Sequence, residues 1–283
     1  MRTTVRHFQK QKETGTPITM ITAYDATSAQ IVERAGIQTI LVGDSLGMVI
    51  QGHENTVPVT LENIIYHTRM VIRGTEKAFV ISDMPFGSYN VSPQQAIENA
   101  VRCLKEGGAQ SVKLEGGVRM AKIIKKLASN GIPVLAHIGL TPQSVYSLGG
   151  WRVQGKTREG AKLLIEDAMA IQEAGAYAVV LELVPSELAK LISERLTIPT
   201  IGIGAGPYCD GQVQVFHDVL GLIEDFVPKH AKQYSQISMT MREALTRYAA
   251  EVEAHEFPTE QNAPGIDEDV LQELYSHIDK NND

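Results

Sequence analysis

Short apolar runs rich in β-branched residues alternate with longer amphipathic segments along most of the chain. The segments between the runs gather apolar residues on one helical face, as Leu61, Ile64 and Ile65 do. Strands that alternate with helices predict a parallel sheet with right-handed crossovers. Seven runs have the length and composition of buried strands: residues 18–24, 39–44, 79–86, 111–116, 133–139, 178–184 and 199–206.

The number of these units favours a closed (β/α)₈ barrel in one domain over an open sheet. Residues 211–221 leave two interpretations, a further helix or the eighth strand. We favour the strand, because Val213 and Val215 alternate with polar neighbours and few residues separate this segment from the seventh strand. We therefore expect residues 1–257 to form the barrel domain.

The C-terminal residues differ from the rest in charge. A helical stretch is expected from Pro228 to about Glu256, followed by an acidic tail over residues 258–283. Residues 260–283 carry a net charge of −6, out of −7 for the whole chain. An apolar stripe within the tail allows a short docking helix, and a mobile tail is the alternative. The stripe consists of Leu271, Leu274, Tyr275 and Ile278.

Composition narrows the class of protein further. The chain of 283 residues is 43% hydrophobic and 21% charged, which is ordinary for a globular protein. No apolar run reaches the roughly 18 residues that a membrane span needs, and the charged N-terminus lacks the apolar core of a signal peptide. Two cysteines form no disulfide framework. No basic stripe indicates nucleic acid, so we expect a cytoplasmic protein that binds neither nucleic acid nor membranes.

Ionisable residues follow or end five of the predicted strands. Buried strands are expected to be almost continuously apolar, and active sites of (β/α)₈ barrels lie at the C-terminal ends of the strands. One such acid is more often a helix cap than a catalytic group, but five strands in succession weaken that interpretation. The residues are Asp44, Asp83, Lys113 with Glu115, His137 and Glu182.

The charge of this set predicts a metal ion. Four carboxylates and one lysine give −3 when His137 is neutral, so either some carboxyls stay protonated or a cation joins them. Oxygen donors without a cysteine or multi-histidine cluster favour Mg²⁺ over Zn²⁺. Glu182 lies among apolar residues, a setting that raises the pKa of a carboxyl and suits it to accept a proton near neutral pH. His137 alone is equally well explained as a core histidine.

Several motifs together closely resemble ketopantoate hydroxymethyltransferase. The resemblance runs in order from about Thr16 to Pro258, and the tail is longer than expected for that family. It implies a (β/α)₈ barrel, Mg²⁺ and a homo-oligomer, a decamer. The motifs include VGDSLGMVIQGHENTVPVT (42–60), SDMPFGSY (82–89), VKLEGG (112–117), AHIGLTPQSV (136–145) and LELVPSELAK (181–190).

The resemblance also implies an activity and residue roles. The family transfers a hydroxymethyl group from 5,10-methylenetetrahydrofolate to 3-methyl-2-oxobutanoate, giving 2-dehydropantoate in pantothenate biosynthesis, through a Mg-stabilised enolate. Glu182 is implied as the base that forms the enolate. The implied substrate-binding residues are Asp44, Ser45, Asp83, Lys113 and His137, and the implied metal-site carboxylates are Asp44, Asp83 and Glu115.

Two other classes of function fit the strand-end residues. A Mg²⁺-dependent lyase or mutase of small carboxylic acids uses similar acids on a similar barrel, and the metal argument does not separate it from the transferase. A catalytically silent oxo-acid binder needs only the chelating residues, so the presence of Glu182 counts against it.

Overall fold

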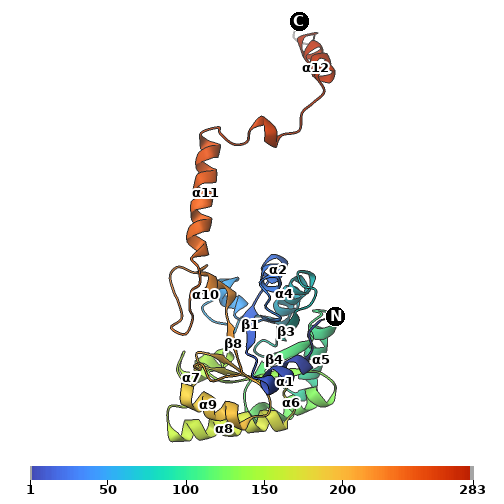
Figure 1. Ribbon diagram of the computed structural model, residues 1–283. Helices are drawn as coiled ribbons and strands as arrows, with labels where there is room; N and C mark the ends of the chain where they lie inside the picture. Colours follow the sequence, from blue (N-terminus) through green and yellow to red (C-terminus); the bar gives the residue numbers. More distant parts are fainter. Residues whose placement is uncertain (1, 281–283) are drawn as a thin grey trace. The chain divides into compact units, whose positions relative to one another are not determined.

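The computed structural model describes residues 2–280 (Figure 1). The chain divides into two compact units, residues up to Ser235 and residues from Gln236 onward. The first unit contains all eight strands and the candidate site.

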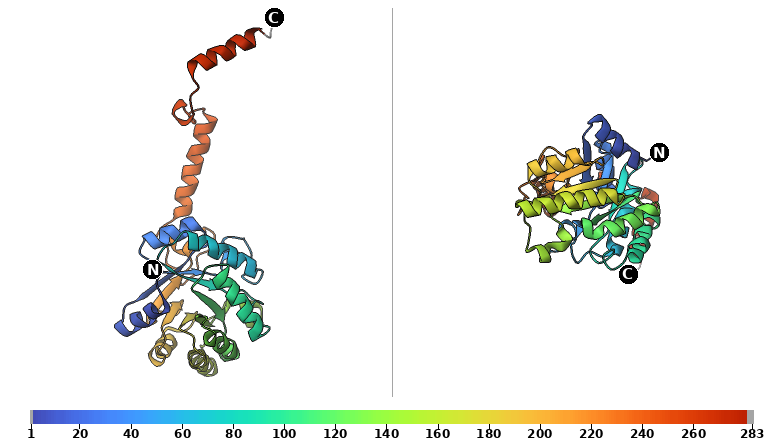
Figure 2. Two further views of the ribbon diagram at one scale, coloured as in Figure 1. Left: turned by 90° about the vertical axis from the view of Figure 1, so that its right-hand side faces the viewer. Right: turned by 90° about the horizontal axis from the view of Figure 1, so that it is seen from below.

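Eight parallel strands close into a barrel in chain order, since β1 pairs with both β2 and β8. This confirms the predicted (β/α)₈ fold, and Figure 2 shows helices surrounding the strands. The strands are β1 Ile18–Thr22, β2 Thr39–Val42, β3 Phe79–Asp83, β4 Ser111–Glu115, β5 Val134–Gly139, β6 Ala178–Glu182, β7 Thr200–Ile203 and β8 Gly211–Gln214.

Amphipathic helices connect the strands on the outside of the barrel. Helix starts follow local chemistry, as where the Ser92 side chain accepts from the backbone N–H of Gln95 and Pro93 occupies the first helical position. The longer helices are α1 Val5–Thr14, α2 Ala26–Arg34, α4 Leu61–Arg73, α5 Pro93–Lys105, α6 Val118–Ser129, α8 Arg158–Glu173 and α9 Ser186–Arg195. The short ones are α3 Leu46–Val49, η1 Pro142–Ser144, α7 Val145–Leu148 and α10 Phe216–Leu220.

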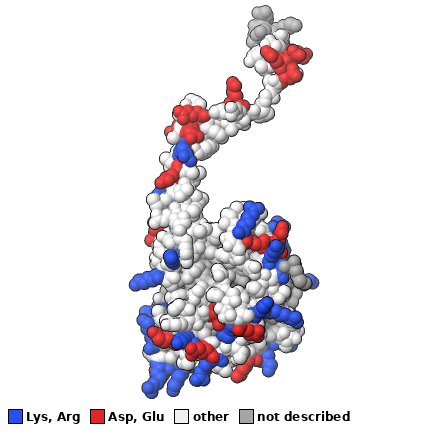
Figure 3. Space-filling model, viewed as in Figure 1, with Lys and Arg blue, Asp and Glu red and all other residues white. Residues whose placement is uncertain are grey.

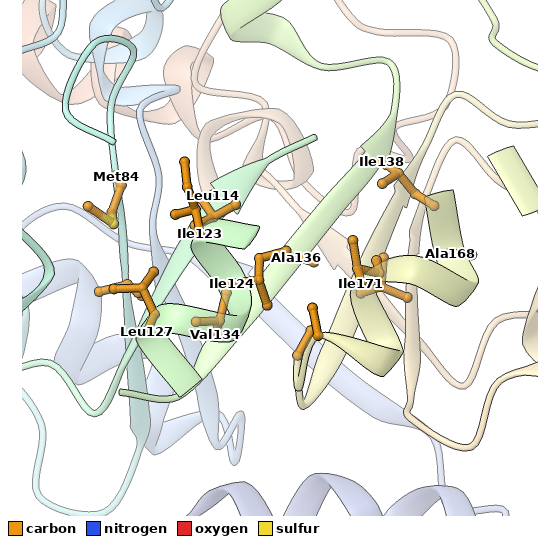
Figure 4. Packing of buried hydrophobic residues seen from close by; sticks show 14 of the residues in the cluster. Met84, Leu114, Ile123, Ile124, Leu127, Val134, Ala136, Ile138, Ala168 and Ile171 are labelled. Atoms are coloured by element: carbon orange, nitrogen blue, oxygen red, sulfur yellow. The ribbon is translucent and has the colours of Figure 1, made fainter. Parts of the chain in front are cut away.

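Alternate residues of each strand pack on opposite sides of the barrel wall. On β5, Leu135 packs inside the barrel, whereas Val134, Ala136 and Ile138 pack outward in the cluster formed with α6 and α8 (Figure 4). Inside, Phe8 of α1 packs edge-on against Phe79 and so closes the N-terminal end of the barrel. Apolar side chains thus fill the N-terminal part of the barrel interior. The inward-facing positions at the C-terminal ends of the strands are polar.

The expected eighth strand is confirmed but is shorter than predicted. It covers residues 211–214, and the residues from Phe216 to Leu220 turn into helix α10. The alternation of apolar and polar residues therefore continues past the last residue that pairs in the sheet.

The second unit contains the helix α11 Ile237–Glu253, the turn η2 Glu260–Asn262 and the helix α12 Glu268–Lys280. The predicted helix after Pro228 exists but begins nine residues later, at Ile237. Helix α12 carries the apolar stripe of the acidic tail. The predicted domain boundary after residue 257 stays a prediction.

No helix within residues 2–280 is long and apolar enough to cross a membrane. Figure 3 shows basic and acidic side chains over the visible face of the first unit.

Candidate active site

Strand register brings the predicted ionisable residues to one end of the barrel. Asp83 on β3 pairs in register with Lys113 on β4, and Glu115 on β4 pairs with His137 on β5. Side chains that are two or four residues apart on a strand point to the same side of it. An inward-facing apolar or small residue precedes each of these four residues by two or four positions on its own strand, so each side chain points inward. Glu182 occupies the same position at the end of β6. The predicted convergence of these side chains is therefore present.

Lys113 and Asp83 form a buried ion pair. The Lys113 Nζ donates to both Asp83 oxygens at 2.7 Å, and the two residues are 4% and 1% exposed. Burial alone lowers the pKa of the Lys113 ammonium, but the surrounding carboxylates outweigh it and the net direction is upward. Lys113 therefore stays charged and holds Asp83 in a fixed orientation.

Asp44 follows β2 and lies beside this pair. Its backbone N–H donates to Asp83 Oδ2 at 3.2 Å, and its own carboxylate accepts from Gln143 Nε2 at 2.9 Å. Burial raises the pKa of Asp44 well above its ordinary value of 3.8, and the Asp83 carboxylate raises it further. The Lys113 ammonium lowers this pKa but does not outweigh burial and the neighbouring carboxylates.

Glu115 has one satisfied oxygen and one unsatisfied oxygen. Oε2 accepts from the backbone N–H of Gln143 at 3.0 Å, while Oε1 is buried without a hydrogen-bond partner among residues 2–280. Oε1 lies 3.8 Å from Lys113 Nζ and 3.4 Å from His137 Nδ1. Burial alone raises the pKa of Glu115, but His137 and Lys113 outweigh it and the net pKa is lowered.

His137 lies between two carboxylates. Its Nδ1 is 3.4 Å from Glu115 Oε1 and its Nε2 is 3.2 Å from Glu182 Oε2, although neither contact has hydrogen-bond geometry. Burial alone lowers the pKa of His137, yet Glu115 and Glu182 raise it to about 9. The Glu182 side chain is 13% exposed, against 2% for His137. Glu182 is therefore the acid of this set that meets solvent.

Ser45, the remaining predicted residue, is half-buried at the start of α3 beside Asp44. Its hydroxyl lies 2.8 Å from the hydroxyl of Tyr24, which follows β1 and is 1% exposed. Burial raises the pKa of Tyr24, so its hydroxyl stays protonated and is available as a donor or acceptor.

Sequence reasoning missed two residues that organise the site. Gln143, in η1, donates through Nε2 to Asp44 Oδ2 and to the backbone oxygen of Met84 at 3.0 Å. The Tyr89 hydroxyl donates to Gln143 Oε1 at 2.6 Å and accepts from the backbone N–H of Glu115 at 3.1 Å. Both are neutral loop residues, and the charge argument that selected the strand-end residues does not select them.

The donor set is compatible with a hard divalent ion. Within residues 2–280, no three His, Cys, Asp or Glu side chains are arranged as a ready-formed metal cluster, and Lys113 occupies both oxygens of Asp83. Oε1 of Glu115 nevertheless has no hydrogen-bond partner, and the raised pKa of Asp44 shows that its negative charge is poorly stabilised, so both residues offer oxygen donors to a cation. Such a set fits Mg²⁺ better than a softer metal.

Comparison of the chain with known proteins gives one consistent result. Residues 2–260 match the family model described as ketopantoate hydroxymethyltransferase. The 3-methyl-2-oxobutanoate hydroxymethyltransferase of Chloroflexus aggregans is 54% identical over 280 residues, covering 99% of this chain and 100% of the relative. The enzyme of the same name from Chloroflexus aurantiacus is 57% identical over 267 residues, covering 94% of each chain.

These alignments correct one expectation about the C-terminus. Because the match with the C. aggregans relative covers 99% of this chain, it includes most of the acidic tail. The tail is therefore not longer than the family allows.

Solved structures share the fold at low sequence identity. Phosphoenolpyruvate phosphomutase from Streptomyces platensis subsp. rosaceus has a TM-score of 0.60 and 12% identity, covering 99% of this chain and 98% of that one. A phosphonopyruvate hydrolase in complex with oxalate and Mg²⁺ has a TM-score of 0.57 and 11% identity, covering 98% of each chain. From the family match and from relatives more than half identical over nearly the whole length, the chain belongs to the ketopantoate hydroxymethyltransferase family and is an enzyme of the transferase class.

Proposed function

We propose that this enzyme transfers a hydroxymethyl group from 5,10-methylenetetrahydrofolate to 3-methyl-2-oxobutanoate, giving 2-dehydropantoate through a Mg-stabilised enolate in pantothenate biosynthesis. The observation that carries the proposal is the position of Glu182. It is a solvent-accessible carboxylate directed into the barrel opening, next to the buried cluster of Asp44, Asp83, Lys113 and Glu115. The family membership supplies the reaction class.

The residues have distinct roles in this reaction. Asp44, Asp83 and Glu115 would hold Mg²⁺, which when bound acts as a Lewis acid on the keto group of the substrate. The Lys113 ammonium and the Ser45 hydroxyl bind the oxo acid, since they are the nearby cationic and hydroxyl donors.

Glu182 takes the proton from C3 of the oxo acid and leaves an enolate. His137, 3.2 Å from Glu182 Oε2, orients that carboxylate. The C3 carbon then forms a bond to the one-carbon unit carried by the folate. Overall, one water molecule is consumed, its oxygen becomes the new hydroxyl group, and the folate leaves as tetrahydrofolate.

Proton exchange at C3 in the absence of folate tests the first step. The enzyme is incubated with 3-methyl-2-oxobutanoate and Mg²⁺ in D₂O, and the C3–H signal is followed by NMR. We expect exchange that EDTA abolishes and that Glu182→Gln slows by about 10²- to 10⁴-fold, the usual contribution of a general base. Glu187→Gln, which removes an exposed acid from α9, is the matched control and keeps the wild-type rate.

The same assay separates the other classes of function. A silent oxo-acid binder shows no exchange, and exchange that is indifferent to Glu182→Gln removes Glu182 as the base. A Mg²⁺-dependent lyase or mutase, the class suggested by the fold neighbours, forms no 2-dehydropantoate when 5,10-methylenetetrahydrofolate is added.

We also propose that the enzyme is a cytoplasmic homo-oligomer, a decamer, as the family resemblance implies. Sedimentation velocity of the full chain tests the decamer. A species of one or two chains at micromolar concentration would contradict it.

A further inference from the structure

A cavity of about 510 Å³ lies outside the barrel wall, beyond the C-terminal ends of β4 and β5 and against the first turn of α6 and the N-terminal part of α8. Its volume is in the range of small-molecule sites. Ile138 lines it and packs outward toward Ala168 and Ile171 of α8 (Figure 4), whereas His137 points into the barrel. The cavity is therefore separate from the buried charge cluster but shares the end of β5 with it.

One residue that lines the cavity is the strand neighbour of the candidate base. Gly139 lines the cavity and pairs in register with Glu182 on β6. A Cβ atom on Gly139 would collide with the backbone oxygen of Glu182, which accepts from the N–H of Leu140. A ligand in the cavity that extends over Gly139 thus arrives beside the backbone of Glu182, whose side chain points into the barrel.

Two opposite charges line the cavity without pairing with each other. Asp167 of α8 uses Oδ1 to accept from the Val118 backbone N–H at 2.7 Å, and its Oδ2 has no partner among the residues described. Arg119 donates through Nη2 to Ser144 Oγ at 3.1 Å, and its charge lowers the pKa of the Asp167 carboxyl without a direct ion pair between the two side chains. A carboxylate and a guanidinium that both remain available suit a ligand with donors and an acceptor along one edge.

The rest of the lining is apolar on one side. Ile138, Leu148 and Leu164 face the cavity, so a flat ring can lie against them while its polar edge contacts Asp167 and Arg119. A reduced pterin has this combination. Its 2-amino group and N3–H are adjacent donors, its 4-oxo group is an acceptor next to them, and N5 follows in the second ring, on the far side of the 4-oxo group from N3.

We propose that this cavity binds the pterin ring of the folate co-substrate, with Asp167 accepting from the 2-amino and N3–H groups and Arg119 donating to the 4-oxo group. This inference rests on the proposed function and adds a folate-binding site to the oxo-acid site. The end of the ring that carries the one-carbon unit then faces Gly139 and the neighbouring Glu182.

Asp167→Asn tests the polar contact. The asparagine retains an oxygen for the Val118 N–H, so the start of α6 keeps its cap, but the second acceptor is replaced by a donor. Because hydrogen bonds to a charged group are among the stronger ones, we expect the KM for 5,10-methylenetetrahydrofolate to rise by about tenfold or more. Glu166→Gln removes a neighbouring exposed acid from the same helix and is expected to leave this KM unchanged.

Ser147→Trp tests the cavity itself. Ser147 is exposed, lines the cavity and donates to the backbone oxygen of Ser144, three residues earlier, at 2.9 Å. Ser129 is also exposed and donates to the backbone oxygen of Lys126 at 3.1 Å, but it lies at the other end of α6. Ser147→Trp is expected to weaken tetrahydrofolate binding in calorimetry by about tenfold, and Ser129→Trp is the matched control.

The exchange assay without folate distinguishes a failure of this inference from a failure of the proposed function. Exchange at C3 is expected to keep the wild-type rate in Asp167→Asn and Ser147→Trp, because neither residue lines the oxo-acid site. Unchanged folate KM and unchanged tetrahydrofolate affinity in both variants would overturn the cavity assignment. Absence of exchange in the wild-type enzyme would instead overturn the proposed function.

Discussion

Lys113 Nζ lies 2.7 Å from both carboxylate oxygens of Asp83, and both side chains are almost completely buried. Desolvation of two charges is costly, and their mutual attraction compensates for it only while both are present. Asp83 therefore has a structural role in addition to its proposed role at the metal.

Removal of one partner of this pair should destabilise the fold. Asp83→Ala leaves the Lys113 ammonium without its bidentate partner, so we expect a loss of about 3–5 kcal/mol of unfolding free energy as well as loss of activity. The double variant Asp83→Leu/Lys113→Met, which replaces both charges by apolar groups, should recover much of that stability and remain inactive. Urea denaturation of the three proteins measures the effect, and additive losses in the double variant would refute the pairing.

The inward orientation of Asp83, Lys113 and Glu115 was predictable from sequence, because side chains two residues apart on a strand point the same way. Which carboxylate Lys113 contacts was not predictable, because the sequence places Glu115 two residues along the same strand but does not show that Asp83 pairs in register with Lys113. A helix and a strand were both open for residues 211–221, and the point at Phe216 where the chain turns from one into the other was not predicted for a related reason. The alternation of apolar and polar residues indicates which face of a segment is buried. It does not indicate where hydrogen bonding to the neighbouring strand ends.

Gln143 is a residue of the site that a search for ionisable residues at the ends of strands does not find. It carries no charge, it lies in the single 3₁₀ turn η1, which is too short to show periodicity, and its partners Asp44, Met84 and Glu115 come from different parts of the chain. Only the closure of the barrel brings these partners together. A neutral residue that connects two carboxylates can therefore be identified from the structure but not from the pattern of residues in the sequence.

Substitution of Gln143 should cost stability and rate together. Gln143→Met keeps the size of the side chain but removes its hydrogen bonds to Asp44, Met84 and Tyr89. We expect a loss of about 2–4 kcal/mol, because buried polar groups are left unsatisfied, and slower exchange at C3 of the oxo acid.

The control for this substitution is Gln94→Met. Gln94 is an exposed residue of α5 whose side chain donates to Glu98 Oε1 at 2.7 Å. Its replacement should change the unfolding free energy by about 0.5 kcal/mol or less. Equal urea midpoints for the Gln143 and Gln94 variants would contradict the bridging role.

Asp218 should make stability depend on pH. Burial raises the pKa of its carboxyl from the ordinary 3.8 to about 6. The folded state binds this proton more tightly than the unfolded state, so the contribution to stability is fully present below pH 3.8 and is lost as the pH rises through about 6. Replacement by Asn, which stays neutral, should therefore stabilise the protein at pH 8.

Urea denaturation of Asp218→Asn at pH 5 and pH 8 measures this dependence. Because relaxation and water penetration relieve part of the cost of a buried charge, we expect a gain of about 1 kcal/mol at pH 8, well below the full value of the shift, and a smaller gain at pH 5. Asp225→Asn, at an exposed loop position, serves as the control. A gain that does not vary with pH would show that ionisation of Asp218 is not its cause.

Gly139 should be required for the position of Glu182. Its φ of 94° lies in a region that favours glycine, and an added Cβ would collide with the backbone oxygen of Glu182. Gly131, with a φ of 78°, has no atom within 4 Å of an added Cβ. Gly131→Ala is therefore expected to cost only the backbone strain, about 1–2 kcal/mol, and to leave exchange at C3 unchanged.

Gly139→Ala adds a steric displacement of Glu182 to the same backbone strain. We expect a larger loss of stability than for Gly131→Ala and a fall of about 10²-fold in exchange, since a displacement of about 1 Å costs that much. The comparison of the two alanine variants in the exchange assay isolates the displacement from the strain. Equal exchange rates in both would mean that the collision with the Glu182 backbone is relieved without moving the carboxylate, and that Gly139 has no part in positioning the base.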